Sequence, residues 1–90
     1  MYCLYMVNDK YARTRYLVTL NEYVVSIGRG ADHFRRMLDN VSSGRVTTSV
    51  TKEQWLSIHK HDIVDMQFME TSFNPEDILK TIKTMNLLGE

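Results

Sequence analysis

Arginine is the residue type in this chain that most directly suggests recognition chemistry. The planar guanidinium forms paired hydrogen bonds with phosphate or carboxylate oxygens, so grouped arginines favour an anionic ligand. Five arginines form the candidate binding set: Arg13, Arg15, Arg29, Arg35 and Arg36. They predict a partner that is either nucleic acid or an acidic protein surface. The alternative is ordinary solvated surface charge with pairing inside the first helix.

Charge is unevenly distributed along the 90 residues, although the formal net charge is zero. Residues 1–52 hold eight Lys or Arg and four Asp or Glu, whereas residues 53–90 hold three and seven. Such an uneven distribution favours a partner of complementary charge.

Length and composition predict a single domain over residues 1–90. No segment approaches the roughly 18 apolar residues of a membrane span, and the apolar start lacks the basic region of a signal peptide. The single cysteine, Cys3, cannot form an internal disulfide and is typical of a reducing compartment. We therefore expect a cytoplasmic domain without membrane contact, and the sequence leaves its oligomeric state open.

Two further groups of residues have spacings that are found at functional sites. Gly28 and Gly30 join an apolar strand to an amphipathic helix, where free backbone N–H groups can bind an anion; a plain turn is the alternative. His59 and His61 precede Asp62, but histidines two residues apart do not share a helix face. A surface loop is favoured there, and no metal site is predicted.

Periodicity predicts the elements that position these residues. Alternating apolar residues indicate strands over 2–8, 13–20 and 23–27, and their short connections predict an antiparallel meander. A helix follows over 31–42. Its buried stripe at helical spacing would consist of Phe34, Met37, Leu38 and Val41.

The second half of the chain carries clear start signals for two more helices. Thr51 and Gln54 have the spacing of a capping box, while Asn74 and Pro75 have the types of an N-cap and a first helical residue. Between these helices, residues 63–71 alternate as a strand, with Met66 and Phe68 on the face expected to be buried. Residues 45–50 are ambiguous between an extended stretch and a loop. The predicted fold class is α/β (α+β): a small, mostly antiparallel sheet flanked by three helices, in the order β-β-(β)-α-α-β-α.

This order, with a glycine turn before the first helix, resembles the GIY-YIG nuclease domain. Cys3 to Asn8 lie where that family has its G-I-Y-x-I-x-N strand, and Ser26-Ile27-Gly28 lie where it has Y-I-G. Residues 59–88 resemble its third strand and last helix. The resemblance implies phosphodiester cleavage by two tyrosines, a first-helix arginine and a divalent cation held by a glutamate of the last helix.

The tyrosine positions of the family match this chain only in part. Tyr5 matches the first tyrosine, and Tyr16 is a second candidate because its spacing to Ser26 is nearer to the family's. Ser26 stands in place of the second tyrosine and cannot act as a phenol. Tyr23 lies three residues before Ser26, so on a regular strand it would face the opposite side.

The arginine and glutamate positions also depart from the family's pattern. Counting from the glycine turn puts Arg36 at the arginine position, but helical phase turns Arg36 outward and puts Met37 there. The middle of the last helix has no carboxylate.

We therefore expect a non-catalytic GIY-YIG-like binding or regulatory domain without a cofactor, for example a phage-type inhibitor or regulator of a host enzyme. The alternative is a divergent endonuclease that cuts DNA or RNA with Mg²⁺, using Tyr5 or Tyr16 together with Arg36.

Overall fold

The computed structural model describes residues 1–44 and 50–88; the ambiguous segment 45–50 lies outside it except for Val50. Four strands form one antiparallel sheet in the order β3-β2-β1-β4. The elements are β1 (Tyr2–Asp9), β2 (Thr14–Leu20), β3 (Tyr23–Gly28), α1 (Ala31–Ser42), α2 (Lys52–His59), β4 (Ile63–Ser72) and α3 (Pro75–Leu88). The predicted fold class, the meander and the element order are confirmed.

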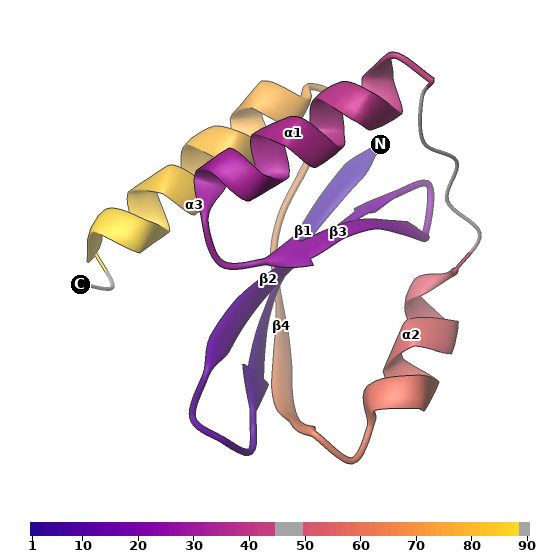
Figure 1. Ribbon diagram of the computed structural model, residues 1–90, viewed down its shortest axis with the longest axis vertical. Coiled ribbons are helices and arrows are strands. Elements are labelled where there is room, and N and C mark those ends of the chain that lie inside the picture. The colour runs from indigo at the N-terminus through magenta and orange to yellow at the C-terminus, as the bar shows by residue number, and fades with distance from the viewer. Residues whose placement is uncertain (45–49, 89–90) are drawn as a thin grey trace.

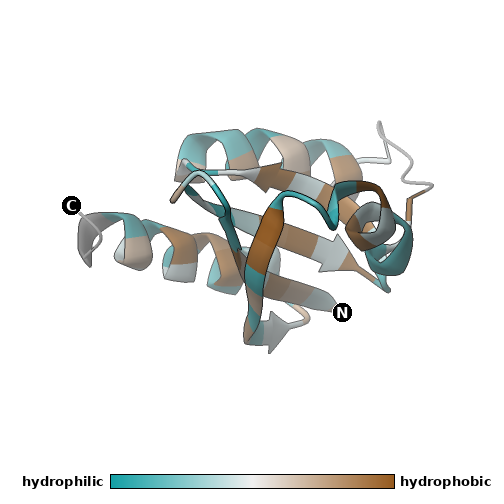
Figure 2. Ribbon diagram, turned by 90° about the horizontal axis from the view of Figure 1, so that it is seen from below, coloured by the Kyte–Doolittle hydropathy of each residue, from teal (hydrophilic) through white to brown (hydrophobic). Residues whose placement is uncertain are grey.

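The helices lie on both faces of the sheet (Figures 1 and 2). α1 and α3 lie side by side on one face, here called the α1/α3 face, while α2 covers part of the other, the α2 face. The larger core fills the α1/α3 face, with Phe34, Ile78 and Ile82 fully buried. A smaller cluster on the α2 face is built around Val7, Leu17 and Trp55. α2 is therefore held by much less apolar packing than the other two helices.

The predicted helix starts are confirmed by their hydrogen bonds. Thr51 Oγ1 accepts from the backbone N–H of Gln54 at 3.2 Å, and Gln54 Oε1 accepts from the backbone N–H of Thr51 at 3.0 Å. Asn74 Oδ1 accepts from the backbone N–H of Glu76 at 3.0 Å. None of the helices in the described residues is long and apolar enough to cross a membrane.

β4 departs from the alternation that its sequence predicts. Two register shifts in its pairing with β1 leave Val64 and Met69 as extra residues. These bulges put Ile63 and Met66 on the α2 face, and Phe68 remains 58% exposed. Met66 and Phe68 share one face, as predicted, but the prediction that both are buried is wrong for Phe68, because Phe68 lies on the edge strand, where no further strand of the described residues covers it.

A bulge in β3 overturns a second prediction. Ser26 pairs with Val18, and Tyr23 pairs with Leu20. The register shift leaves Val25 as an extra, unpaired residue of β3. Val18 and Leu20 are two residues apart, so Tyr23 and Ser26 lie on the same face of the sheet. The expectation that Tyr23 faces the side opposite to Ser26 is therefore wrong, because it assumed a regular strand without a bulge.

The turn between β2 and β3 consists of two residues in the left-handed region. Asn21 has φ 52° and Glu22 has φ 76°, the backbone of a type I′ hairpin turn. Asparagine tolerates this conformation, but a glutamate in it carries a steric penalty. The Glu22 carbonyl also accepts a hydrogen bond from the backbone N–H of Lys52 at 2.9 Å, which links the turn to α2.

Replacing Glu22 with glycine is expected to raise the free energy of unfolding by about 1 kcal/mol, because glycine adopts positive φ without the penalty. The main-chain bond to Lys52 is kept in this variant. Urea denaturation measures the change. Glu22→Ala is the matched control and should bring no gain, since it retains a Cβ; equal stabilisation by alanine would contradict the backbone explanation.

Candidate functional site

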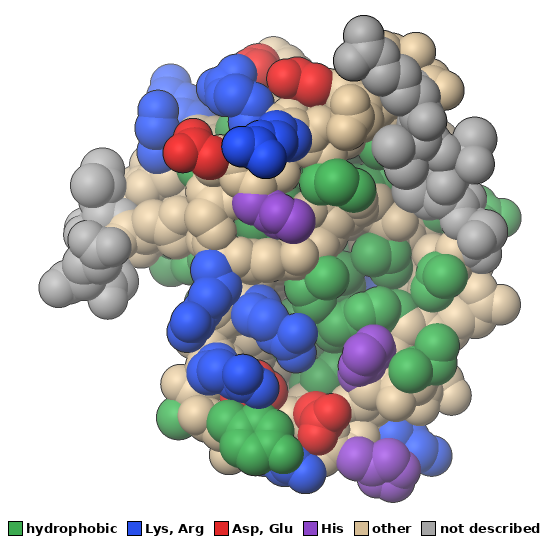
Figure 3. Space-filling view, viewed as in Figure 1, with side chains coloured by type: hydrophobic (Ala, Val, Ile, Leu, Met, Phe, Trp, Pro, Cys, Tyr) green, Lys and Arg blue, Asp and Glu red, His purple; other side chains and the backbone are tan. Residues whose placement is uncertain are grey.

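The five candidate arginines divide into two groups. One group lies at the end of the sheet that contains the β1–β2 turn and the last residue of β3: Arg13, Arg15 and Arg29. The other group lies on α1: Arg35 and Arg36. Figure 3 shows basic side chains gathered over these two separate areas. The arginines therefore form two surfaces and not one continuous site.

Arg15 and Arg29 are brought together by the strand register. The last pair of β2 and β3 is Tyr16 with Gly28; Arg15 is the next residue on β2, and Arg29 directly follows the end of β3. Arg15 pairs with Val7 of the second apolar cluster, so it lies on the α2 face. Arg29 Nε donates to the backbone oxygen of Thr14 at 3.3 Å, which holds Arg29 against β2.

This pair of cations lacks a neutralising group. Within residues 1–44 and 50–88, neither Arg15 nor Arg29 has a carboxylate within salt-bridge distance. Arg15 Nε is also buried and has no hydrogen-bond partner there. Like charges that lie close together repel, and a buried donor without an acceptor is costly. A bound anion would reduce the repulsion between the two charges.

Asp9, the last residue of β1, forms its hydrogen bonds within the β1–β2 turn. Its side chain is 1% exposed. Its carboxylate accepts from the backbone N–H groups of Tyr11 at 2.9 Å and Arg13 at 3.0 Å, and from Arg13 Nε at 3.1 Å. Burial by itself would raise the pKa of Asp9, but these hydrogen bonds and the Arg13 charge outweigh it and hold that pKa below its ordinary value. Asp9 therefore stays ionised and neutralises Arg13.

The lowered pKa of Asp9 predicts a stability that decreases in acid. A carboxyl group with a lower pKa in the folded state stabilises the fold fully above its unfolded pKa of about 3.9, and this contribution is lost as the pH falls through the folded value. Urea denaturation of the wild type should therefore show a loss of stability below about pH 4. Asp9→Asn should be less stable at pH 7 and depend less on acid pH; an identical acid limb in both proteins would contradict the assignment.

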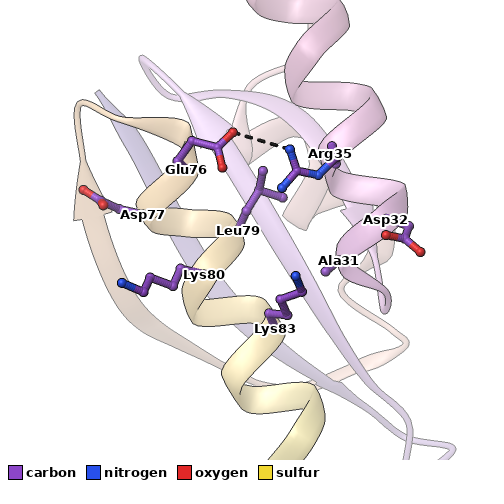
Figure 4. Close-up of a pocket in the computed structure, with 8 residues that line it drawn as sticks. All are labelled: Ala31, Asp32, Arg35, Glu76, Asp77, Leu79, Lys80 and Lys83. Carbon is purple, nitrogen blue, oxygen red and sulfur yellow. Dashed lines mark ion pairs between the residues drawn. The ribbon is translucent and has the colours of Figure 1, made fainter.

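One arginine of the α1 group is paired with an acidic side chain, whereas Arg36 has no carboxylate within 4.0 Å in the described ranges. Arg35 Nη1 lies 3.6 Å from Glu76 Oε1, an ion pair that links α1 to α3 (Figure 4). The depression around this pair mixes acidic, basic and apolar residues: Ala31, Asp32, Arg35, Glu76, Asp77, Leu79, Lys80 and Lys83. Its balance of three carboxylates and three cations makes it a poor anion site.

Arg36 is exposed on the outer side of α1, as helical phase predicts. Met37 is half-buried and lines the same surface depression as Arg36. Phe34 and Leu38 hold the buried stripe of the helix. Met37 was predicted to belong to the buried stripe, but it lies at the edge of that stripe.

The two candidate tyrosines lie on opposite faces of the sheet. Tyr16 is buried in the core of the α1/α3 face. Tyr5 pairs with Leu17, the neighbour of Tyr16, and so points to the α2 face. Its hydroxyl accepts a hydrogen bond from Lys52 Nζ at 3.3 Å, which raises the pKa of Lys52. Tyr5, Tyr16 and the exposed Arg36 therefore do not converge on one site.

The remaining candidates occupy structural positions. Ser26 is 4% exposed and its Oγ has no partner among the described residues. The His59 ring stacks on Trp55, with 4.7 Å between ring centroids, while His61 is exposed. In the described ranges no three histidine, cysteine or carboxylate side chains lie close enough to hold a metal ion.

The adjacency of Arg15 and Arg29 is the feature that the sequence analysis missed. The sequence did contain a signal for it. From the two-residue turn at Asn21 and Glu22, the residues that pair across β2 and β3 can be counted outward. The bulge in β3 shifts that count by one residue and places Arg29 beside Arg15.

Comparison with known proteins adds no relative: no family model, no curated protein and no solved structure matches this chain.

Proposed function

We propose that this chain is a non-catalytic binding domain with a GIY-YIG-like order of elements, which binds the phosphate backbone of a nucleic acid. Arg15 and Arg29 make the main contacts, and Arg13 lies beside them. The observation that supports this most is the hydrogen bond from Arg29 Nε to the backbone oxygen of Thr14, the residue before Arg15, with no carboxylate within salt-bridge distance of either arginine in the described ranges. The proposed setting is the cytoplasm, where the free thiol of Cys3 stays reduced.

Phosphate suits this pair of arginines better than a protein carboxylate. Each guanidinium offers several donors in a fixed plane, and a phosphate group has oxygen acceptors enough for two forks at once. A nucleic acid also repeats its phosphates along the strand, so the terminal nitrogens of Arg13, whose Nε is bonded to Asp9, can contact a second one. The alternative partner, an acidic protein surface, would have to present two carboxylates at this spacing.

The regulatory role rests on what the candidate catalytic residues do in the fold. Tyr5 is bonded to Lys52, and Tyr16 is packed in the opposite core. A nuclease that used either tyrosine with Arg36 would need a large rearrangement. A small domain that binds nucleic acid without cutting it is suited to blocking or regulating a host enzyme, as a phage-type inhibitor does.

The proposal predicts salt-dependent binding that is lost with the Arg15/Arg29 pair. Affinity for labelled single-stranded and duplex oligonucleotides, measured by fluorescence anisotropy, should fall with log[salt] with a slope of about −2 to −3, as for two or three phosphate contacts. Arg15→Gln/Arg29→Gln should reduce that slope by about 2 and leaves the contact between Arg13 and Asp9 in place.

Arg35→Gln/Arg36→Gln is the matched control, because it removes the same charge from α1. Equal losses in the two double variants would indicate only a general charge effect. Absence of binding at low salt would overturn the proposal. Incubation of the same oligonucleotides with Mg²⁺ tests the alternative: cleavage that Tyr5→Phe abolishes would establish an endonuclease.

A further inference from the structure

The outer edge of β4 is the open edge of the sheet. β4 ends the strand order and pairs only with β1 in the described part of the chain. At the other end, β3 is partly covered, because Val24 N–H donates to the oxygen of Val50 at 2.8 Å and Tyr23 bridges to Thr51. A free edge presents unpaired backbone N–H and C=O groups to any extended chain. β4 is the longest strand, with ten residues, and offers the longest such edge.

Large apolar side chains lie exposed along this edge. Val64 is 70% exposed and Phe68 is 58% exposed. Across the α2 face, the register places Phe68 at the end of a row that continues through Tyr5 and Leu17 to Ile27. The Phe68 ring meets Tyr5 edge-on at 5.6 Å between centroids, and no further strand of the described residues covers its other side. One more strand would extend this row and bury Phe68.

The segment that contains this edge is acidic. From Asp62 to Asp77 there are five carboxylates and no lysine or arginine. Two of them are paired with cations from other elements, Asp62 with Lys10 at 3.3 Å and Glu76 with Arg35 at 3.6 Å. The other three have no lysine or arginine within 4.0 Å in the described ranges: Asp65 and Glu70 on β4, and Asp77 on α3. Glu70 accepts a hydrogen bond from Thr81 and Asp77 accepts one from Ser72, so their charges are not neutralised.

We propose that β4 binds an extended segment of another protein as a fifth strand. The segment would alternate lysine or arginine with β-branched or aromatic residues, so that its apolar side chains cover Phe68 and its cations face the acidic edge. A second copy of this chain fits poorly, because pairing β4 with itself would bring two acidic segments together. This surface does not involve the arginine pair, so the chain could hold nucleic acid and a protein partner together.

A synthetic ten-residue peptide of alternating lysine and valine, titrated into the ¹⁵N-labelled protein, tests this proposal. The peptide should shift the amide resonances of β4 between residues 64 and 70, whereas the same peptide with glutamate in place of lysine should not. Val64→Lys/Phe68→Lys should weaken binding at least about tenfold, since lysine on an edge strand blocks pairing.

Ile58→Lys is the control, because Ile58 on α2 is 69% exposed and lies outside β4. Arg15→Gln/Arg29→Gln should also leave peptide binding unchanged, which separates this proposal from the proposed nucleic-acid site. Equal binding by the Val64/Phe68 variant, or shifts confined to other elements, would overturn the inference. So would a salt-insensitive dimer in sedimentation that the same variant dissociates, because β4 would then serve self-association.

Discussion

Replacing Arg15 with methionine is expected to stabilise the free protein by about 1 kcal/mol and to weaken nucleic-acid binding about tenfold. The two changes have opposite signs because they arise from the same feature. In the free protein, the Nε donor of Arg15 is buried without an acceptor among the described residues, and Arg29 is held at the adjacent residue, Thr14. A bound phosphate would supply the negative charge that both arginines lack.

Methionine suits this test because it keeps an unbranched apolar stem of similar reach. The stem of Arg15 lies beside Val7 on the α2 face, so the packing there is largely retained. Urea denaturation gives the free energy of unfolding, and anisotropy with a fixed oligonucleotide at low salt gives the affinity.

Arg36→Met provides the comparison for both measurements. Arg36 is exposed on α1, so its replacement should change stability by less than about 0.5 kcal/mol and leave binding nearly unchanged. If Arg15→Met destabilises the protein and leaves binding intact, Arg15 is a structural residue and the proposed site is wrong.

Local signals in the sequence were sufficient to predict the helix starts and the hairpin, which depend on residues close together in the chain. The capping box at Thr51 and the N-cap at Asn74 predicted the starts of α2 and α3, because the hydrogen bonds involved span only two or three residues. The short connection at Asn21 and Glu22 likewise predicted the hairpin of β2 and β3.

The bulges could not be predicted in the same way. A bulge is decided by how two strands pack against the rest of the sheet, and a sequence that alternates, such as residues 63–71, carries no sign of it. The bulge at Met69 pairs Phe68 with Tyr5 on the α2 face, and the bulge in β3 brings Arg29 to the position next to Arg15. The two surfaces proposed to bind partners therefore both depend on register shifts that only the structure reveals.

The place of the fourth strand in the sheet was also beyond local reasoning. Sequence periodicity identified the strand over 63–71, but it did not indicate that this strand would pair with β1 and end the sheet. Pairing between residues more than 50 positions apart depends on the tertiary fold. For this reason the sequence showed only that acidic residues are concentrated in the second half of the chain. It did not show that some of them lie along an open edge of the sheet.

Trp55→Ala is expected to cost about 3–5 kcal/mol of unfolding free energy, the largest effect of any substitution considered. Trp55 is the only buried side chain of α2 among the described residues, and it packs in the cluster with Val7 and Leu17. Both of those residues have 0% exposure. Removing the indole leaves a cavity on the α2 face and removes the main apolar attachment of the helix.

This loss would approach the whole stability of a small domain, which is about 5–15 kcal/mol. Trp55 is the single tryptophan, so the variant must be followed by far-ultraviolet circular dichroism and not by fluorescence. Trp55→Phe should recover most of the stability, because an aromatic ring still fills the site.

Ile58→Ala changes the exposed side of the same helix and should cost less than about 0.5 kcal/mol. A loss below about 1 kcal/mol for Trp55→Ala would mean that the turn contact between Glu22 and Lys52, and not the indole, holds α2 on the sheet. In that case α2 would be a detachable cover, and the α2 face, with Tyr5 and Arg15 on it, would be more open to ligands than its burial indicates.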